Sequence, residues 1–195
     1  MNQADMTIAR RAMIDSQLRT SGVNQEFVLA RMNSVAREEF VPDAVKSLAY
    51  MDRAIPLGEG RFLSSPVVHG MLLAEAAPKR DDTVLVVENG ASYLAELVKP
   101  LVAKVETISA QDAAGTGRGR KKFSLIIIDG AVEEVSDLLD KRLEEGGRIV
   151  TGLVSRGVTR LASGRKVSGK IALQPLAEIG IPVLAMFAKP EGWSF

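Results

Sequence analysis

The sequence predicts an α/β protein in which a mostly parallel sheet is covered by helices on both faces. Continuous apolar runs occur at residues 84–87, at 125–128, and at 149–150 with Leu153 and Val154 just beyond. Runs without polar alternation are typical of parallel strands that are buried on both faces. Helical patterns separate the runs along the chain, and this alternation indicates a doubly wound fold.

Two amphipathic segments lie between the apolar runs. Apolar side chains recur at helical spacing in residues 91–99 and again in residues 133–145, where a pair of glycines follows. Glycine just after the last periodic residue favours the end of a helix. We therefore expect one helix in each segment.

Ahead of the sheet, the chain predicts an N-terminal helical cover. Short helices are expected at residues 7–20, 24–34 and 43–50, with Asn24 and Asp43 as N-caps.

A further helix is expected to begin at Pro66, because proline is favoured at the first helical position. Ser64 or Ser65 precedes it and is a plausible cap, since a serine hydroxyl can accept from the free N–H groups of the first turn. The helix is expected to run to residue 77.

The remainder of the chain predicts two more strands, at residues 171–176 and 183–187, and a linker at 113–122. The length fits one domain, since domains usually hold about 100–200 residues. We divide it into a cover and substrate-side segment, 1–78, and a sheet core, 79–195.

Composition and charge exclude several classes of protein. The chain has 195 residues, of which 46% are hydrophobic and 25% charged, and its net charge is +1. No overall field attracts nucleic acid or an anionic membrane. The chain has no cysteine and only one histidine, His69, so we expect no disulfide, thiolate or metal chemistry. Neither residues 1–11 nor the apolar stretch 179–188 fits a signal peptide or a membrane span, and we expect a cytoplasmic protein.

Several segments occur in a fixed order. They read ARRAMIDSQLRTSGV (9–23), REEFVPDAVKSLAYMDRAIPLGEG (37–60) and LSSPVVHGML (63–72), and later IIIDGAVEEV and LEEGGRIV. These segments resemble the protein-L-isoaspartate O-methyltransferase family, which is built on the Rossmann-like fold of S-adenosylmethionine-dependent methyltransferases. The order of FVP, AYMD, IPLG and SSP is the most specific feature, because it lies outside the general methyltransferase scaffold.

The resemblance implies a protein-repair activity, in which a methyl group passes from S-adenosylmethionine to an L-isoaspartyl carboxylate of a damaged protein. Ser64 matches the serine that meets that carboxylate in the family and is the expected catalytic residue. Asp52, Ser65 and His69 are expected on the substrate side. The carboxylate is already ionised, so the site must supply positioning and exclusion of water. The alternative is that Ser64 or Ser65 only caps the helix at Pro66.

The glycine turn after the first strand departs from the family pattern. The family has an acid, an apolar residue and three glycines spaced two apart, closed by a tyrosine. Here the stretch reads VLVVENGASY (84–93). Aligned on Tyr93, Val86 replaces the acid, Glu88 stands at the first glycine, Gly90 is kept and Ser92 replaces the third.

The five positions expected to contact the donor are Glu88, Asn89, Gly90, Ser109 and Asp129. Glu88 has two alternative outcomes, since it would either pair with the donor's ammonium or repel the donor's own carboxylate. At about 4 Å and an effective dielectric near 20, the repulsion would be about 4 kcal/mol. Ser109 stands where the family has an acid that binds the ribose hydroxyls. Asp129 follows an apolar strand and is expected either to line the cleft or to cap the next segment.

The connection after Ser109 is too short for the usual scaffold. It has 13 residues, 110–122, whereas a helix, a strand and a further helix need roughly 30. We expect the sheet to lack this edge strand, which leaves strand 103–108 at the margin, where Lys104 and Glu106 are typical of an edge. A homodimer through strand 103–108 is a possible consequence.

These departures predict a family member with weakened S-adenosylmethionine binding, a scaffold rather than an enzyme. The alternative is an active carboxyl O-methyltransferase acting on protein or peptide carboxylates. A second alternative, which we do not expect, is a nucleic-acid-binding module that uses Arg118, Arg120, Lys121 and Lys122. Charged residues on a loop are more often simply solvated.

Overall fold

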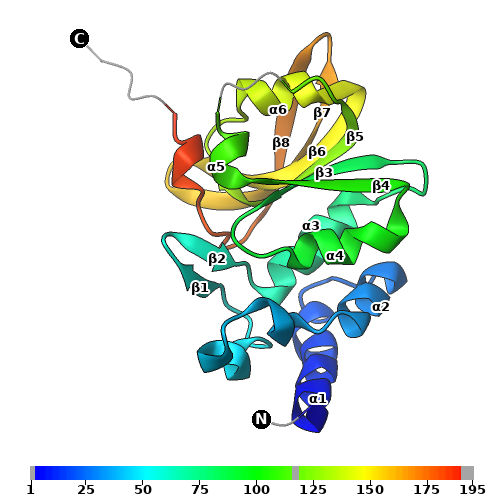
Figure 1. Cartoon of the computed structure of the whole chain (residues 1–195), viewed down its shortest axis with the longest axis vertical. Coiled ribbons are helices and arrows are strands. Elements are labelled where there is room, and N and C mark those ends of the chain that lie inside the picture. Colours follow the sequence, from blue (N-terminus) through cyan, green and yellow to red (C-terminus); the bar gives the residue numbers. More distant parts are fainter. Residues whose placement is uncertain (1–2, 116–118, 190–195) are drawn as a thin grey trace.

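The computed structural model describes residues 3–115 and 119–189, and a six-stranded sheet runs through its centre (Figure 1). The strands lie in the order β4, β3, β5, β6, β7, β8. The pairs β4–β3, β3–β5 and β5–β6 are parallel, whereas β6–β7 and β7–β8 are antiparallel. The strands are β3 Thr83–Glu88, β4 Lys104–Ser109, β5 Phe123–Val132, β6 Leu143–Ser155, β7 Val158–Val167 and β8 Lys170–Glu178.

Helices cover both faces of the sheet, which confirms the doubly wound α/β fold. Successive side chains of a strand point to opposite faces. On one face Val84 and Val86 pack in a core with α1 to α4, and on the other Leu85 and Val87 pack with α5 and α6. The helices are α1 Gln3–Met13, α2 Glu26–Ser34, α3 Pro66–Ala76, α4 Tyr93–Val98, α5 Ala110–Ala113 and α6 Asp137–Arg142.

The N-terminal cover forms as expected and lies below the sheet in Figure 1. One short helical turn follows α1, two more follow α2, and then a small hairpin reaches α3. These pieces are a π-helical turn Ile14–Leu18, 3-10 turns Arg37–Phe40 and Asp43–Leu48, and strands β1 Ile55–Gly58 and β2 Arg61–Leu63. No helix among the described residues is long and apolar enough to cross a membrane.

The N-caps predicted for this cover, Asn24 and Asp43, are wrong. Gln25 and Pro42 occupy the N-cap positions, and neither gives a side-chain cap. Asp43 is already inside its helical turn, where its carboxylate pairs with Lys46 at 2.7 Å. Asn24 lies one residue too early to cap α2.

Three further expectations change in the C-terminal half. The helix expected at 133–145 is shorter than predicted and consists of α6 alone. It ends at Arg142, because Leu143 already belongs to β6 and pairs with Phe123 of β5. Strand β7 was not expected at all. The strand expected at 183–187 is wrong: Val183 makes one isolated bridge to Ala131, and Ala185–Phe187 is a 3-10 turn.

Strand β4 is the margin of the sheet, as the sequence predicts. Among the described residues it pairs only with β3. Glu106 on this strand forms ion pairs with Lys104, Lys121 and Arg142. Charged side chains are a common protection of sheet edges against pairing with another chain. A homodimer through 103–108 stays a prediction.

Arg37 ties the N-terminal cover to the sheet side of the molecule. Its guanidinium is fully buried and donates from Nε to the Ala49 carbonyl at 2.7 Å, from Nη1 to Nδ1 of His69 at 2.8 Å, and from Nη2 to the Ser64 carbonyl. It also lies 5.1 Å from the ring centroid of Tyr93. One side chain therefore joins a helical turn, the entry to α3, α3 itself and α4.

Replacing this guanidinium should destabilise the whole fold. Arg37→Met leaves two buried carbonyls and a ring nitrogen without a donor, and we expect a loss of about 3–5 kcal/mol in the free energy of unfolding, the range for breaking a buried charged contact from one side. Urea denaturation measures it. Arg53→Met, at an exposed position of the same cover, should change stability by less than about 0.5 kcal/mol. Equal losses in the two variants would contradict the role given to Arg37.

Candidate functional site

The expected donor-binding residues gather where parallel strands end. Glu88 is the last residue of β3 and Ser109 the last of β4, and the two are register partners. Asn89 and Gly90 follow β3 directly. Crevices at the carboxyl ends of parallel strands are the usual ligand sites of open α/β sheets.

A pocket of about 430 Å³ lies at this edge, within the range of roughly 300–1,000 Å³ usual for small-molecule sites. Four of the five expected donor contacts line it, and Asp129 does not. Arg61 and Met186 also line it, which sequence reasoning missed. They reach the pocket from the β1–β2 hairpin and from the C-terminal turn, and no pattern in the sequence indicates such an approach. The four expected lining residues are Glu88, Asn89, Gly90 and Ser109.

The turn after β3 requires the one glycine that remains. Gly90 has φ of +98°, and a Cβ at this position would lie 2.8 Å from Cβ of Arg61. Next to it, the buried amide nitrogen of Asn89 and Oε1 of Glu88 have no hydrogen-bond partner in the described chain. Two polar groups on the pocket wall are therefore unsatisfied within the protein itself.

Glu88 carries an acid that the pocket does not neutralise. Burial raises the pKa of its carboxyl, and the nearby carboxylates of Asp129 and Glu96 raise it further. No ion pair with a cation is formed by Glu88 in the described chain. Arg61 also lines the pocket but pairs with Glu59 at 3.1 Å, so the ionised Glu88 leaves the wall with one negative charge.

Ser109 is engaged in local structure. Its Oγ accepts from the backbone N–H of Asp112 at 3.1 Å and donates to the Asp112 carboxylate at 2.7 Å. It caps the short helix α5. The hydroxyl is therefore held by the chain at the position where the family resemblance implies an acid for the ribose.

Ser64 and Ser65 have different roles. Ser65 is the N-cap of α3 and accepts from the N–H of Val68 at 3.4 Å, and Asp52 accepts from Val67 N–H at the same distance. Ser64 does not cap the helix. It is fully buried, and its hydroxyl donates to Asp129 at 2.6 Å.

Asp129 is the centre of a buried polar chain. One carboxylate oxygen accepts from the Ser64 hydroxyl, and the other accepts from Nε2 of His69 at 2.9 Å. A shift in register between Ile127 and Ala131 interrupts the ladder of β5 and β6 at this point, and such bulges re-aim side chains. Arg37 completes the chain behind His69.

The protonation of this chain follows from its contacts. An arginine only donates, so Nδ1 of His69 accepts from Arg37, and the ring proton is on Nε2 facing Asp129. Burial lowers the pKa of His69 more than Asp129 raises it. Burial alone would raise the pKa of Asp129, but His69, Ser64 and Arg37 together hold it below its usual value. The ring is neutral and the carboxylate ionised.

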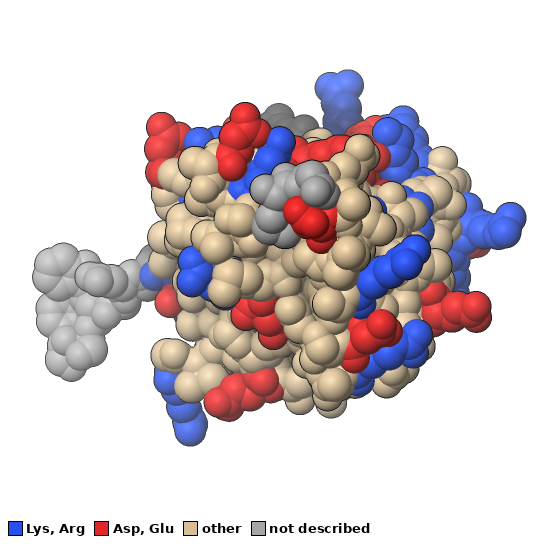
Figure 2. Space-filling view, turned by 90° about the horizontal axis from the view of Figure 1, so that it is seen from below, with Lys and Arg blue, Asp and Glu red and all other residues tan. Residues whose placement is uncertain are grey.

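In the part that the structure describes, the basic loop is only partly paired. Arg118 lies outside the described residues. Lys121 pairs with Glu106, whereas Arg120 and Lys122 are exposed. A different face, the one that the N-terminal helices form, carries intermixed acidic and basic side chains (Figure 2). These contacts give no support to nucleic-acid binding.

Comparison with solved structures agrees with the fold. A Plasmodium falciparum beta-aspartate methyltransferase, crystallised with S-adenosyl-L-homocysteine, matches with a TM-score of 0.68 and 15% identity, over 91% of this chain and 98% of that one. A second protein-L-isoaspartate O-methyltransferase structure matches with a TM-score of 0.69 and 14% identity, over 90% of this chain and 66% of that one. The expected methyltransferase form of the fold is confirmed.

Sequence comparison gives the family. The model of protein-L-isoaspartate(D-aspartate) O-methyltransferases matches residues 9–115. The protein-L-isoaspartate O-methyltransferase of Methanoculleus marisnigri is 28% identical over 94% of this chain and 93% of its own. Protein-L-isoaspartate O-methyltransferase 2 of Anaeromyxobacter sp. is 32% identical over 72% of this chain and 68% of its own length. The chain therefore belongs to the protein-L-isoaspartate O-methyltransferase family.

Proposed function

We propose that this family member binds S-adenosylmethionine only weakly and acts as a binding scaffold rather than as a methyltransferase. The observation that carries the proposal is Glu88, an acid with an unpaired buried oxygen at the turn where the donor's methionine part would lie. The donor brings both a carboxylate and an ammonium to this turn, and the proposal requires that Glu88 meets the carboxylate. The residues present do not fit it.

Charge is the first reason for the misfit. The Glu88 carboxyl already faces the fields of Asp129 and Glu96, which raise its pKa. A donor carboxylate at about 4 Å would add a repulsion on the order of 4 kcal/mol at an effective dielectric near 20. Even half of that repulsion weakens binding more than tenfold, at about 1.4 kcal/mol per factor of ten.

The ribose contact is the second reason. The hydroxyl of Ser109 already has Asp112 as both donor and acceptor partner. Losing a hydrogen bond to a charged group costs roughly 1.5–3 kcal/mol. The connection after α5 also supplies no strand beyond β4 in the described chain, which leaves that side of the pocket open.

The position of Ser64 argues against catalysis. Its hydroxyl is fully buried and bonded to an ionised carboxylate, so it is not presented to a substrate. A substrate carboxylate brought to Ser64 would also meet the negative charge of Asp129 behind it. Both observations favour a structural role for this serine.

The alternative is an active carboxyl O-methyltransferase for isoaspartyl proteins. One arrangement favours it: the pocket of about 430 Å³ persists at the ends of β3 and β4, and the amide of Asn89 has no partner there. The Asp112 carboxylate accepts from the Ser109 hydroxyl at 2.7 Å, so an acid lies next to the position where the family resemblance implies one. An active enzyme of this kind requires that substrate binding release the Ser64 hydroxyl from its hydrogen bond to Asp129.

Titration calorimetry with S-adenosylmethionine separates the two readings. We expect no saturable binding by the natural chain at micromolar donor, because Glu88 and Ser109 oppose it. The double variant Glu88→Gly, Ser109→Glu should bind the donor at least roughly tenfold more tightly, because it removes the repulsion and supplies an acid. Micromolar binding by the natural chain would refute the proposal.

Single variants divide the effect into its parts. Glu88→Gln removes the charge and keeps the size, and Glu88→Gly removes both. If charge dominates, the two give similar gains in donor affinity. A gain only in the glycine variant shows that the side chain blocks the pocket sterically. No gain in any variant, including the double variant, would show that Glu88 and Ser109 are not the cause of weak binding.

The pKa of Glu88 predicts a pH-dependent stability. The pKa of Glu88 is higher in the folded state than in the unfolded state, where it is roughly 4.3. The ionised carboxyl therefore destabilises the folded state as pH rises above about 4.3, and the full effect is reached above the folded-state pKa. Glu88→Gln should therefore be more stable than the natural chain at pH 7, with a difference that shrinks as pH falls toward 4.5. Urea denaturation across this range measures it. Glu134→Gln, at an exposed position, is the control. A constant difference would contradict the raised pKa.

A further inference from the structure

A second cavity, of about 500 Å³, lies at the opposite edge of the sheet, near the start of β3. It is enclosed by the end of α3 and by β6, β7 and β8, and it shares no lining residue with the pocket at the ends of β3 and β4. Its charged lining residues are Glu75, Lys79, Arg148 and Arg165, and its uncharged polar ones include Ser163 and Gln174. Positive charge exceeds negative charge on its wall.

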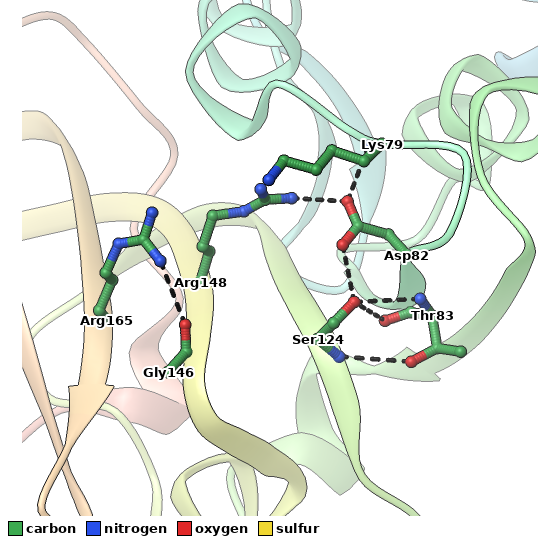
Figure 3. A network of polar contacts seen from close by, with 7 residues as sticks. All are labelled: Lys79, Asp82, Thr83, Ser124, Gly146, Arg148 and Arg165. Atoms are coloured by element: carbon green, nitrogen blue, oxygen red, sulfur yellow. Dashed lines mark hydrogen bonds and ion pairs between the residues drawn. The ribbon is translucent and has the colours of Figure 1, made fainter.

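The two arginines are placed as direct neighbours. Arg148 on β6 and Arg165 on β7 are register partners in an antiparallel pair, so their side chains leave the same face of the sheet. Like charges directly opposite one another destabilise a sheet. The Lys79 side chain extends toward Arg148 from the segment after α3 (Figure 3). An anion between these groups would convert the repulsion into attraction.

Arg148 is held in a fixed orientation. Its Nη2 donates to Asp82 at 2.5 Å, and Asp82, which is 6% exposed, also accepts from the Ser124 hydroxyl and the Lys79 backbone N–H, each at 2.7 Å. Nε of Arg148 is buried and donates to no group in the described chain. Asp82 therefore fixes the orientation of the guanidinium through Nη2, while the N–H of Nε has no acceptor in the described chain.

Arg165 has no acidic partner in the described chain. Its Nη1 donates to the Gly146 carbonyl at 3.2 Å (Figure 3), and the residue lines the cavity. Asp82 neutralises Arg148, and Glu75 is the one carboxylate that lines the cavity. The charges of Lys79 and Arg165 together exceed that of Glu75.

We propose that this cavity binds the phosphate group of a small phosphorylated compound. Planar guanidinium groups bind phosphate through pairs of charge-assisted hydrogen bonds, and a lysine adds a point charge. The cations converge on a recess rather than forming a stripe across the surface, which suits a small anion better than a nucleic-acid backbone. Ser163 and Gln174 supply hydrogen bonds for the remainder of the compound.

Calorimetry with inorganic pyrophosphate as the probe tests the proposal on the full chain. We expect saturable binding that weakens as salt rises, since the contact is electrostatic. Arg165→Gln should weaken binding roughly ten- to hundredfold, the effect of losing a hydrogen bond from a charged group. Lys79→Gln should weaken it as well, and both positions are exposed, so the variants should fold.

Arg160→Gln is the matched control, because it removes the same charge from the same strand β7. Arg160 pairs with Glu178 and does not line the cavity. Its affinity for pyrophosphate should equal that of the natural chain. An equal loss in the Arg160 and Arg165 variants would overturn the site, because only net charge would matter. Absence of pyrophosphate binding at low salt would overturn it too, and so would stronger binding of a single-stranded RNA that Arg165→Gln leaves unchanged.

Discussion

The arrangement of this protein depends on a buried charge that is neutralised at a distance. The Asp129 carboxylate and the Arg37 guanidinium do not touch, and the neutral ring of His69 connects them, accepting from one and donating to the other. Neither charge is exposed, so each would be very costly alone. The chain of contacts fixes the N-terminal cover against α3 and the sheet, and it binds the Ser64 hydroxyl at its end.

That constraint links the fold to function. The serine that the family resemblance assigns to substrate is occupied by Asp129, and the negative charge of Asp129 also raises the pKa of Glu88 at the neighbouring turn. The same buried carboxylate therefore acts on both residues, as the partner of the serine and as a charge that favours the protonated form of the glutamate. The opposite edge of the sheet has the reverse character, since its cavity has surplus cations. One edge of the sheet therefore carries an unpaired acid, Glu88, and the opposite edge carries an excess of basic side chains.

The sequence predicts the parts of this molecule whose signal is local. Parallel strands were recognisable from apolar runs, the edge from its charges, and the altered glycine turn from one alignment on Tyr93. Strand β7 was not, because it carries Arg160, Arg165 and Lys166 and draws its stability from pairing on both sides. The sequence predicts Asp129 as a cleft or cap residue, but its partners lie 60 and 65 residues away along the chain. Such contacts arise from topology and leave no local pattern.

The central claim is that the inherited donor cradle no longer accepts the donor. A crystal structure of the natural chain soaked with S-adenosylhomocysteine at millimolar concentration tests it most directly. The account predicts that no nucleoside is ordered between Asn89 and Ser109 and that Ser64 stays bonded to Asp129. Ordered adenosine beside Gly90, with the Glu88 side chain turned aside, would contradict it.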